Sequence, residues 1–96
     1  RAPADPWTWT QLGELELAEG RPAEAELLAR AGLTWSPDES ALHTLLAQAA
    51  DARGGRAVRV AVLLENAASR PTAAAAHFEL ARARFDEGRF VSTERE

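Results

Sequence analysis

The sequence contains no cysteine, methionine, tyrosine or lysine, and its aromatic residues are limited to three tryptophans and three phenylalanines. Without cysteine the chain can form neither a disulfide nor a thiolate metal site, although this leaves its redox compartment open. The chain also lacks an apolar run near the roughly 20 residues that a membrane span needs, and no charged-then-apolar leader opens it. We therefore expect no membrane insertion.

The charges argue against a further class of function. All 11 basic residues are arginine, and 15 acids give a net charge of −4. Residues 1–51 carry three arginines and nine acids, a balance of −6, whereas residues 52–96 carry eight arginines and six acids, a balance of +2. Because no basic footprint exists overall, we expect no nucleic-acid partner. The arginine-only, alanine-rich usage suggests a GC-rich bacterial genome, and the start at Arg1 suggests a fragment or a processed product of one small domain.

Matching residues recur 34 positions apart along the chain. Trp9, His43 and His77 occupy equivalent places. The same step relates Gly20, Gly54 and Gly88, then Leu12, Leu46 and Leu80, then Gly13, Ala47 and Ala81, and finally Pro37 and Pro71. Internal similarity at such a period predicts an array in which each unit buries its apolar face against its neighbours.

The first unit contains signals for two helices. Residues 1–5 form a linker, and Asp5 followed by Pro6 is typical of a helix cap and first turn. Gly20 is expected to end this first helix, and Pro22 to start the second. Small residues along both helices would allow their backbones to approach closely.

Later boundaries repeat this scheme with one irregularity. Ser36 and Glu39 have the spacing of a capping box, which predicts the start of a third helix there. Its end is expected at Gly54-Gly55, where one residue is inserted relative to the first unit. A fourth helix is expected over about 56–69 and a fifth over about 72–87. Gly88 would end the fifth helix, and a short sixth would begin at Arg89.

The chain resembles the tetratricopeptide repeat family on the basis of these spacings. Trp9, Leu12 and Gly13 have the spacing W-x2-L-G, and Gly20, Ala25 and Pro37 follow at the expected places. The resemblance covers residues 6–96 as a single domain, with units of about 6–39, 40–73 and 74–96, the last incomplete. The sequence departs from the family pattern at four places, which are Glu16, Ala50 and Arg84 at positions commonly aromatic, and Arg59 where a small residue is expected.

The resemblance implies an all-α fold in which antiparallel helix pairs stack into a right-handed superhelix. The first helices of the units would line a concave groove that holds an extended peptide or a helix of a partner protein. The function implied is a non-enzymatic protein-interaction scaffold without cofactor or metal. Projected onto this chain, the groove residues are Trp7, Thr10, Glu14, Leu17, Thr44, Gln48, Asp51, Phe78, Arg82 and Phe85.

One subgroup of this family captures the carboxylate terminus of heat-shock chaperones with a clamp of lysines, asparagines and an arginine. In this chain Thr10 and Glu14 stand where the first lysine and asparagine would be. An acid at that place repels a carboxylate. Capture of a chaperone tail is therefore disfavoured.

Three groups of residues suggest chemistry, and the repeat offers a structural interpretation of each. His43 and His77 could bind a metal, but they occupy the place where the family packs a residue between its two helices, and no third ligand accompanies them. The acids between Glu14 and Glu26 could act in acid–base catalysis, but a solvated face is favoured. Arginines 53, 56 and 59 could meet a phosphate or an acidic partner, although the adjoining glycines lack the phosphate-loop sequence. A solvated stripe, or pairing with the acidic first unit of another copy, is favoured.

The tryptophans differ in what they suggest. Trp9 is expected in the core, and Trp35 is expected to cap the second helix against the next unit. Trp7 should point about 160° away from Trp9, so that it either contacts a partner or covers the open end of the array.

A second function remains open beside groove binding. The last unit carries Phe85, Phe90 and Val91 without a following helix, and exposed apolar ends favour self-association into a dimer. An accessory domain of a larger enzyme or regulator is compatible with either function. The sequence names neither the partner nor the pathway, and it leaves bacterial cytoplasm and periplasm equally open.

Overall fold

The computed structural model describes the backbone of residues 5–95 and the side chains of residues 5–85. Every regular element in this part of the chain is a helix, which confirms the all-α prediction. The four helices are α1 (Pro6–Ala18), α2 (Pro22–Trp35), α3 (Ser40–Ser69) and α4 (Ala74–Arg95). Of the expected linker, residues 1–4 lie outside the described residues.

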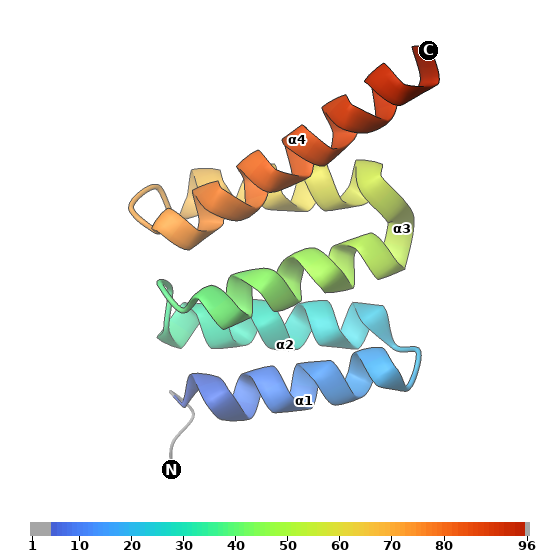
Figure 1. The fold of residues 1–96 in the computed structure, drawn as a ribbon. Helices are drawn as coiled ribbons and strands as arrows, with labels where there is room; N and C mark the ends of the chain where they lie inside the picture. Colours follow the sequence, from blue (N-terminus) through green and yellow to red (C-terminus); the bar gives the residue numbers. More distant parts are fainter. Residues whose placement is uncertain (1–4, 96) are drawn as a thin grey trace.

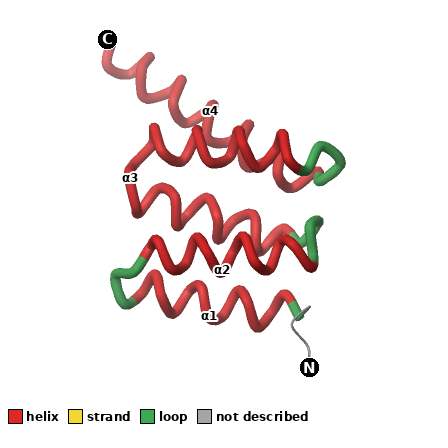
Figure 2. Tube along the Cα trace, turned by 180° about the vertical axis from the view of Figure 1, so that it is seen from behind, coloured by secondary structure: helices red, strands yellow, loops and turns green. Residues whose placement is uncertain are grey.

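The helices run back and forth and stack side by side (Figure 1). Helix α3 reverses direction at Gly55, whose φ of 80° and ψ of −165° are non-helical. We call residues 40–54 the first arm of α3 and residues 56–69 its second arm. Each helix contacts the next one along the chain, and α1 also contacts α3. The tube in Figure 2 shows the same order of helices from the opposite side.

Glycine in the left-handed region of φ makes two of the reversals. Gly20 has a φ of +77°. The N–H of Gly20 donates to the carbonyl of Leu17 at 3.0 Å, and the N–H of Arg21 donates to that of Glu16 at 2.8 Å. This pair of hydrogen bonds is a Schellman motif, which satisfies carbonyls that the end of α1 leaves unpaired. The hydrogen bond from Arg21 to the Glu16 carboxylate, and then the charges of Glu16 and Glu19, raise the pKa of Arg21.

The second reversal lies one residue later than the first. The positive-φ glycines are Gly20 and Gly55, which lie 35 positions apart and not 34. The burial pattern nevertheless keeps the 34-residue step on both sides of the reversal, since Gly13 matches Ala47 and Ala29 matches Leu63 as buried residues. The turn is therefore shifted by one residue, and the expected insertion is not found.

Two expected helix boundaries are placed differently by the structure. Asp5 caps α1 as predicted, because its carboxylate accepts the N–H of Trp7 at 3.1 Å. The helix start predicted directly behind Ser36 is wrong, since α3 begins at Ser40 behind Glu39, which makes no side-chain cap. The chain first makes a turn in which the Ser36 carbonyl accepts the N–H of Glu39 at 3.2 Å. That turn separates Ser36 from the first residue of α3.

The predicted helix end at Gly88 is also wrong, because α4 continues through it to Arg95. No proline follows Gly88, in contrast to Pro22 behind Gly20. A glycine inside a helix costs about 1 kcal/mol relative to alanine, which a longer helix tolerates. A separate sixth helix at Arg89 is therefore absent from the described backbone.

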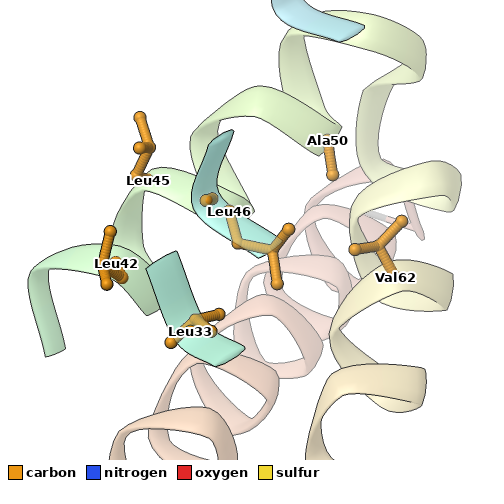
Figure 3. Close-up of a cluster of buried hydrophobic side chains, with 7 residues drawn as sticks. Leu33, Leu42, Leu45, Leu46, Ala50 and Val62 are labelled. Carbon is orange, nitrogen blue, oxygen red and sulfur yellow. The ribbon is translucent and has the colours of Figure 1, made fainter. Parts of the chain in front are cut away.

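The largest buried cluster lies between α2 and the two arms of α3 (Figure 3). Trp9 and Leu17 of α1 pack against it from one side, which confirms Trp9 as a core contact. By contrast, Trp35 is 56% exposed, so the predicted cap over the end of α2 is wrong. The cluster consists of Ala29, Leu33, Leu42, Leu45, Leu46, Ala50 and Val62.

The contact of α1 with α2 depends on a matched pair of large and small residues. A Cβ built on Gly32 would lie 2.9 Å from the Cβ of Trp9, closer than real side chains pack. One unit later the equivalent places hold His43 and Asn66, whose side chains are 2.9 Å apart and hydrogen bonded. The large Trp9 ring thus lies against the small Gly32, whereas the smaller His43 ring lies against the larger Asn66.

We expect this size matching to appear as coupling in a double-mutant cycle. Gly32→Asn alone should lower the free energy of unfolding by about 1–3 kcal/mol, because the new side chain collides with both Trp9 and Leu42. Adding Trp9→His should recover part of that loss, since it recreates the His43–Asn66 pair in the first unit. Urea unfolding followed by circular dichroism measures both values.

Thr34→Asn serves as the control, because Thr34 is exposed on the same helix. It should change the free energy of unfolding little. Strictly additive losses from Gly32→Asn and Trp9→His would contradict the pairing.

Candidate functional site

The predicted groove residues fall into three rows that cross α1, the first arm of α3 and α4. Members of a row are 34 positions apart, so each occupies the same place on its helix. The three helices adjoin, because α1 and α4 both contact α3. Trp7 stands alone at the start of α1. The rows are Thr10, Thr44 and Phe78; Glu14, Gln48 and Arg82; and Leu17, Asp51 and Phe85.

Both threonine hydroxyls already have acceptors inside the protein. Thr10 Oγ1 donates to the Pro6 carbonyl at 2.8 Å, one turn back along α1. Thr44 Oγ1 donates to Glu79 Oε2 at 2.8 Å and so joins the first arm to α4. These two residues are half-buried, and both hydroxyl donors are used in hydrogen bonds within the protein.

Leu17 likewise contributes to the interior, since it is half-buried and packs against the main core cluster. The other members of its row, Asp51 and Phe85, are exposed. This row therefore offers a carboxylate and an aromatic ring to the solvent.

The middle row is exposed along its whole length and changes sign. Glu14 is acidic, Gln48 is neutral, and Arg82 is basic. A ligand lying across the three helices would meet a gradient of charge from α1 to α4. Such a gradient favours one orientation of a charged ligand over the other.

Large aromatic surfaces stand at both ends of the rows. Trp7 is 68% exposed on α1, whereas Phe78 and Phe85 are 61% and 63% exposed on α4. The guanidinium carbon of Arg82 lies 5.9 Å from the centre of the Phe78 ring, within the range of a cation–π contact. Aromatic and arginine side chains are the types that most often dominate binding energy at protein interfaces.

A small hollow of about 70 Å³ opens between α4 and the two arms of α3. Typical small-molecule sites measure about 300–1,000 Å³, so this hollow suits one side chain of a larger ligand. It brings together three of the predicted groove residues, Gln48, Asp51 and Arg82. Ala47, Arg59, Leu63, Glu79 and Ala83 complete its lining.

Glu79 is the member of this site that the sequence interpretation missed. Only 4% of it is exposed, and its carboxylate lies 3.8 Å from Arg82 as well as bonding to Thr44. A signal was available, because Glu79 lies 34 positions after the core residue Leu45. An acid in a core register is unusual unless it is paired.

His43 is committed to a structural hydrogen-bond network. Its ring is 0% exposed, with Nε2 2.7 Å from the Pro37 carbonyl and Nδ1 2.9 Å from the Asn66 amide. A carbonyl only accepts, so Nε2 carries the hydrogen. Arg70 donates to Asn66 Oδ1 at 2.8 Å, which turns the amide nitrogen toward His43. Both ring nitrogens of the neutral tautomer are thereby used.

Among the side chains of residues 5–85, His77 makes only the first of these bonds. Its Nε2 lies 2.9 Å from the Pro71 carbonyl, and the side chain is exposed. Within residues 5–85, no group of three or more histidine, cysteine or acidic side chains is placed to hold a metal ion. The burial of His43 agrees with the prediction that it packs between helices, whereas His77 is exposed, so that prediction is wrong for His77.

The acid-rich segment contains one residue that is not a solvated surface acid. Glu26 is 7% exposed and accepts from Arg30 at 3.0 Å and from Arg53 at 2.7 Å. Arg30 also reaches Glu65 at 3.3 Å. This network ties α2 to both arms of α3, so Arg53 has a structural partner.

The remaining predictions are tested only in part. Phe85 of the expected self-association surface is exposed, whereas Phe90 and Val91 lie outside the residues whose side chains are described. Self-association stays a prediction. None of the helices searched in the described part of the chain has both the length and the hydropathy to cross a bilayer.

Comparisons with protein-family models, with curated proteins and with solved structures gave no significant match to this chain.

The two histidines should differ sharply in their effect on stability. His43→Ala should lower the free energy of unfolding by about 2–4 kcal/mol, because it leaves a cavity and removes the acceptor of the buried Asn66 amide. His77→Ala should lower it by less than about 1 kcal/mol, since that ring is exposed. Urea denaturation of both variants measures the difference. Equal losses would show that the two rings do not have the environments described.

Proposed function

We propose that this chain is a tetratricopeptide-type array that acts as a non-enzymatic scaffold for a partner protein. A peptide or helix of the partner would bind across α1, the first arm of α3 and α4. The observation that carries the proposal is the hollow beside Gln48, Asp51 and Arg82, flanked by exposed phenylalanines on α4.

The family assignment is supported by contacts that recur in register. The bond from His43 to the Pro37 carbonyl is repeated 34 positions later by His77 and Pro71. The turn that closes on the Ser36 carbonyl is repeated on the Arg70 carbonyl, which accepts the N–H of Ala73 at 3.0 Å. Equal local geometry at equal spacing is what stacked repeats require. A right-handed superhelix follows from the family resemblance.

The surface favours a ligand with one apolar anchor and charges of both signs. The hollow admits a single side chain, and Phe78 and Phe85 offer apolar area beside it. An acidic ligand residue would pair with Arg82, and a basic one with Glu14. The partner segment would therefore lie with its acidic part over α4 and its basic part over α1.

Alanine at four surface positions tests this function. Trp7→Ala, Gln48→Ala, Arg82→Ala and Phe85→Ala together should abolish pull-down of a partner identified with the unaltered chain. The helical circular dichroism signal should stay the same, because all four residues are exposed. Loss of aromatic and arginine contacts of this kind typically costs about 2 kcal/mol or more each in binding.

A matched control uses exposed apolar residues on the second helices of the units. Leu27, Trp35 and Leu64 are 66%, 56% and 48% exposed, yet none belongs to the groove rows. Their combined substitution by alanine should leave binding unchanged. The groove assignment would be contradicted if the four-residue variant still bound the partner, or if the control variant lost binding to the same extent.

A further inference from the structure

The hollow between α4 and the two arms of α3 replaces an apolar contact of the preceding unit. In that unit Leu45 of the first arm packs against Gly13 of α1, so closely that Gly13 has no room for a Cβ. The residues 34 positions later are Glu79 and Ala47, and both line the hollow. An acid therefore stands where the preceding unit has a buried leucine, and space remains beside it.

Other lining residues change in the same direction. Leu17 and Ala25 of the first unit are matched by Asp51 and Arg59 of the hollow. Every lining residue belongs to α4 or to an arm of α3, and the equivalent space in the preceding unit is filled by Leu45. The hollow is therefore a property of these three helical segments and does not depend on a further helix.

The charges around the hollow cancel. Asp51 and Glu79 are acidic, and Arg59 and Arg82 are basic. A cation in the hollow would be attracted by the two acids but repelled by the two arginines, and an anion would meet the reverse. Since either ion would also lose hydration, the lining favours a neutral group.

The buried Glu79 carboxylate has one oxygen available to a ligand. Its Oε2 accepts the Thr44 hydroxyl at 2.8 Å, whereas Oε1 lies 3.8 Å from Arg82, which is longer than a hydrogen bond. Within residues 5–85, Oε1 accepts no hydrogen bond, although only 4% of Glu79 is exposed. Because a buried acceptor without a donor is costly, the hollow favours a ligand that donates to Oε1.

The hollow offers donors as well as acceptors. Gln48 and Arg82 both line it, and both residues are exposed. A side-chain carboxamide has two N–H donors and a carbonyl acceptor, whereas an ammonium only donates and a carboxylate only accepts. A hydroxyl has a single donor, although two carboxylates are present. The carboxamide is thus the neutral side-chain group that matches the lining best.

We propose that the hollow binds the side-chain carboxamide of an asparagine or glutamine in the partner segment. The amide N–H groups donate to Glu79 Oε1 and to Asp51, and the carbonyl accepts from Arg82. Arg82 keeps further N–H groups for an acidic residue of the same segment. This inference rests on the proposed function, because the segment that carries the amide is the one bound in the groove.

A set of capped pentapeptides provides the probe. Each peptide has two alanines on either side of one central residue, an acetyl group at its start and an N-methylamide at its end. The central side chain therefore holds the only primary carboxamide. The central residue is glutamine, asparagine, glutamate, lysine, leucine or serine, so that charge and hydrogen bonding vary on a constant backbone.

The peptides are titrated into the full chain carrying nitrogen-15 in the side-chain amides of its two glutamines, Gln11 and Gln48. The tighter of the two carboxamide peptides should move the Gln48 resonance saturably, with a Kd of about 5 mM or below. Gln11 is exposed on α1 outside the hollow, so its resonance should stay in place. The other four peptides should bind at least about threefold more weakly, since each leaves a charge or an acceptor unmatched.

A double variant removes the polar lining and restores the residue type of the preceding unit. Glu79→Leu recreates the equivalent of Leu45, and Thr44→Val avoids a hydroxyl left without its acceptor. The helical circular dichroism signal should persist, and the carboxamide peptides should bind no more tightly than the leucine peptide. Glu24→Leu makes the same change of charge at an exposed place on α2 and should leave the preference unchanged.

These measurements need no partner protein, so they separate this inference from the groove function. A carboxamide preference, together with pull-down that the four-residue alanine variant retains, would contradict the groove function and leave the carboxamide site in place. Loss of pull-down in that variant without a carboxamide preference would contradict this inference alone.

Three results would overturn the proposal. One is the absence of a Gln48 shift with either carboxamide peptide at concentrations up to about 20 mM, well above the expected Kd. Another is equal or tighter binding of the glutamate, lysine, leucine or serine peptide. The third is a carboxamide preference that persists when Glu79→Leu and Thr44→Val are combined.

Discussion

The first arm of α3 is the element on which the rest of the structure depends, because its neighbours cover it from several directions. Its leucines pack against α2. His43 is hydrogen bonded to Asn66 of the second arm, and Thr44 is hydrogen bonded to Glu79 of α4. A single helix pair cannot bury its own apolar surface, so each unit relies on the next. The arm is where the two neighbouring pairs meet, and its loss would separate them.

This constraint also explains where polar groups are buried. Glu26 and Glu79 are 7% and 4% exposed, and each bonds to a different helix or arm. A buried carboxylate is tolerated only when hydrogen bonds or charges compensate its lost hydration. Both acids therefore serve as cross-links that fix how α2 and α4 lie against α3. The geometry of the candidate surface across α1, the first arm and α4 depends on these cross-links.

Much of the fold follows from the repeat. The 34-residue step, the cap at Asp5 and the reversals at Gly20 and at Gly54-Gly55 could all be recognised, because each depends on local residue types. Ser36 and Gly88 were misassigned for the opposite reason. A turn lies between Ser36 and the start of α3, and α4 runs through Gly88, so neither local signal set the helix boundary.

The candidate surface was less predictable than the fold. The 34-residue register predicted that Gln48, Asp51 and Arg82 belong to one surface, and all three line the same hollow in the structure. Register did not show that Leu17 packs into the core or that Thr10 and Thr44 donate within the protein. Those facts depend on side-chain contacts between helices, which a spacing rule does not contain.

Amide hydrogen exchange under native conditions tests the central place of the first arm most directly. The slowest amides should be those of residues 42–50, because they open only when both neighbouring pairs separate. Amides of residues 74–85 should exchange at least about tenfold faster, since His77, Ala81 and Arg84 are exposed at places where the first arm is buried. Equal protection of the two segments, or slower exchange in α4, would contradict this account.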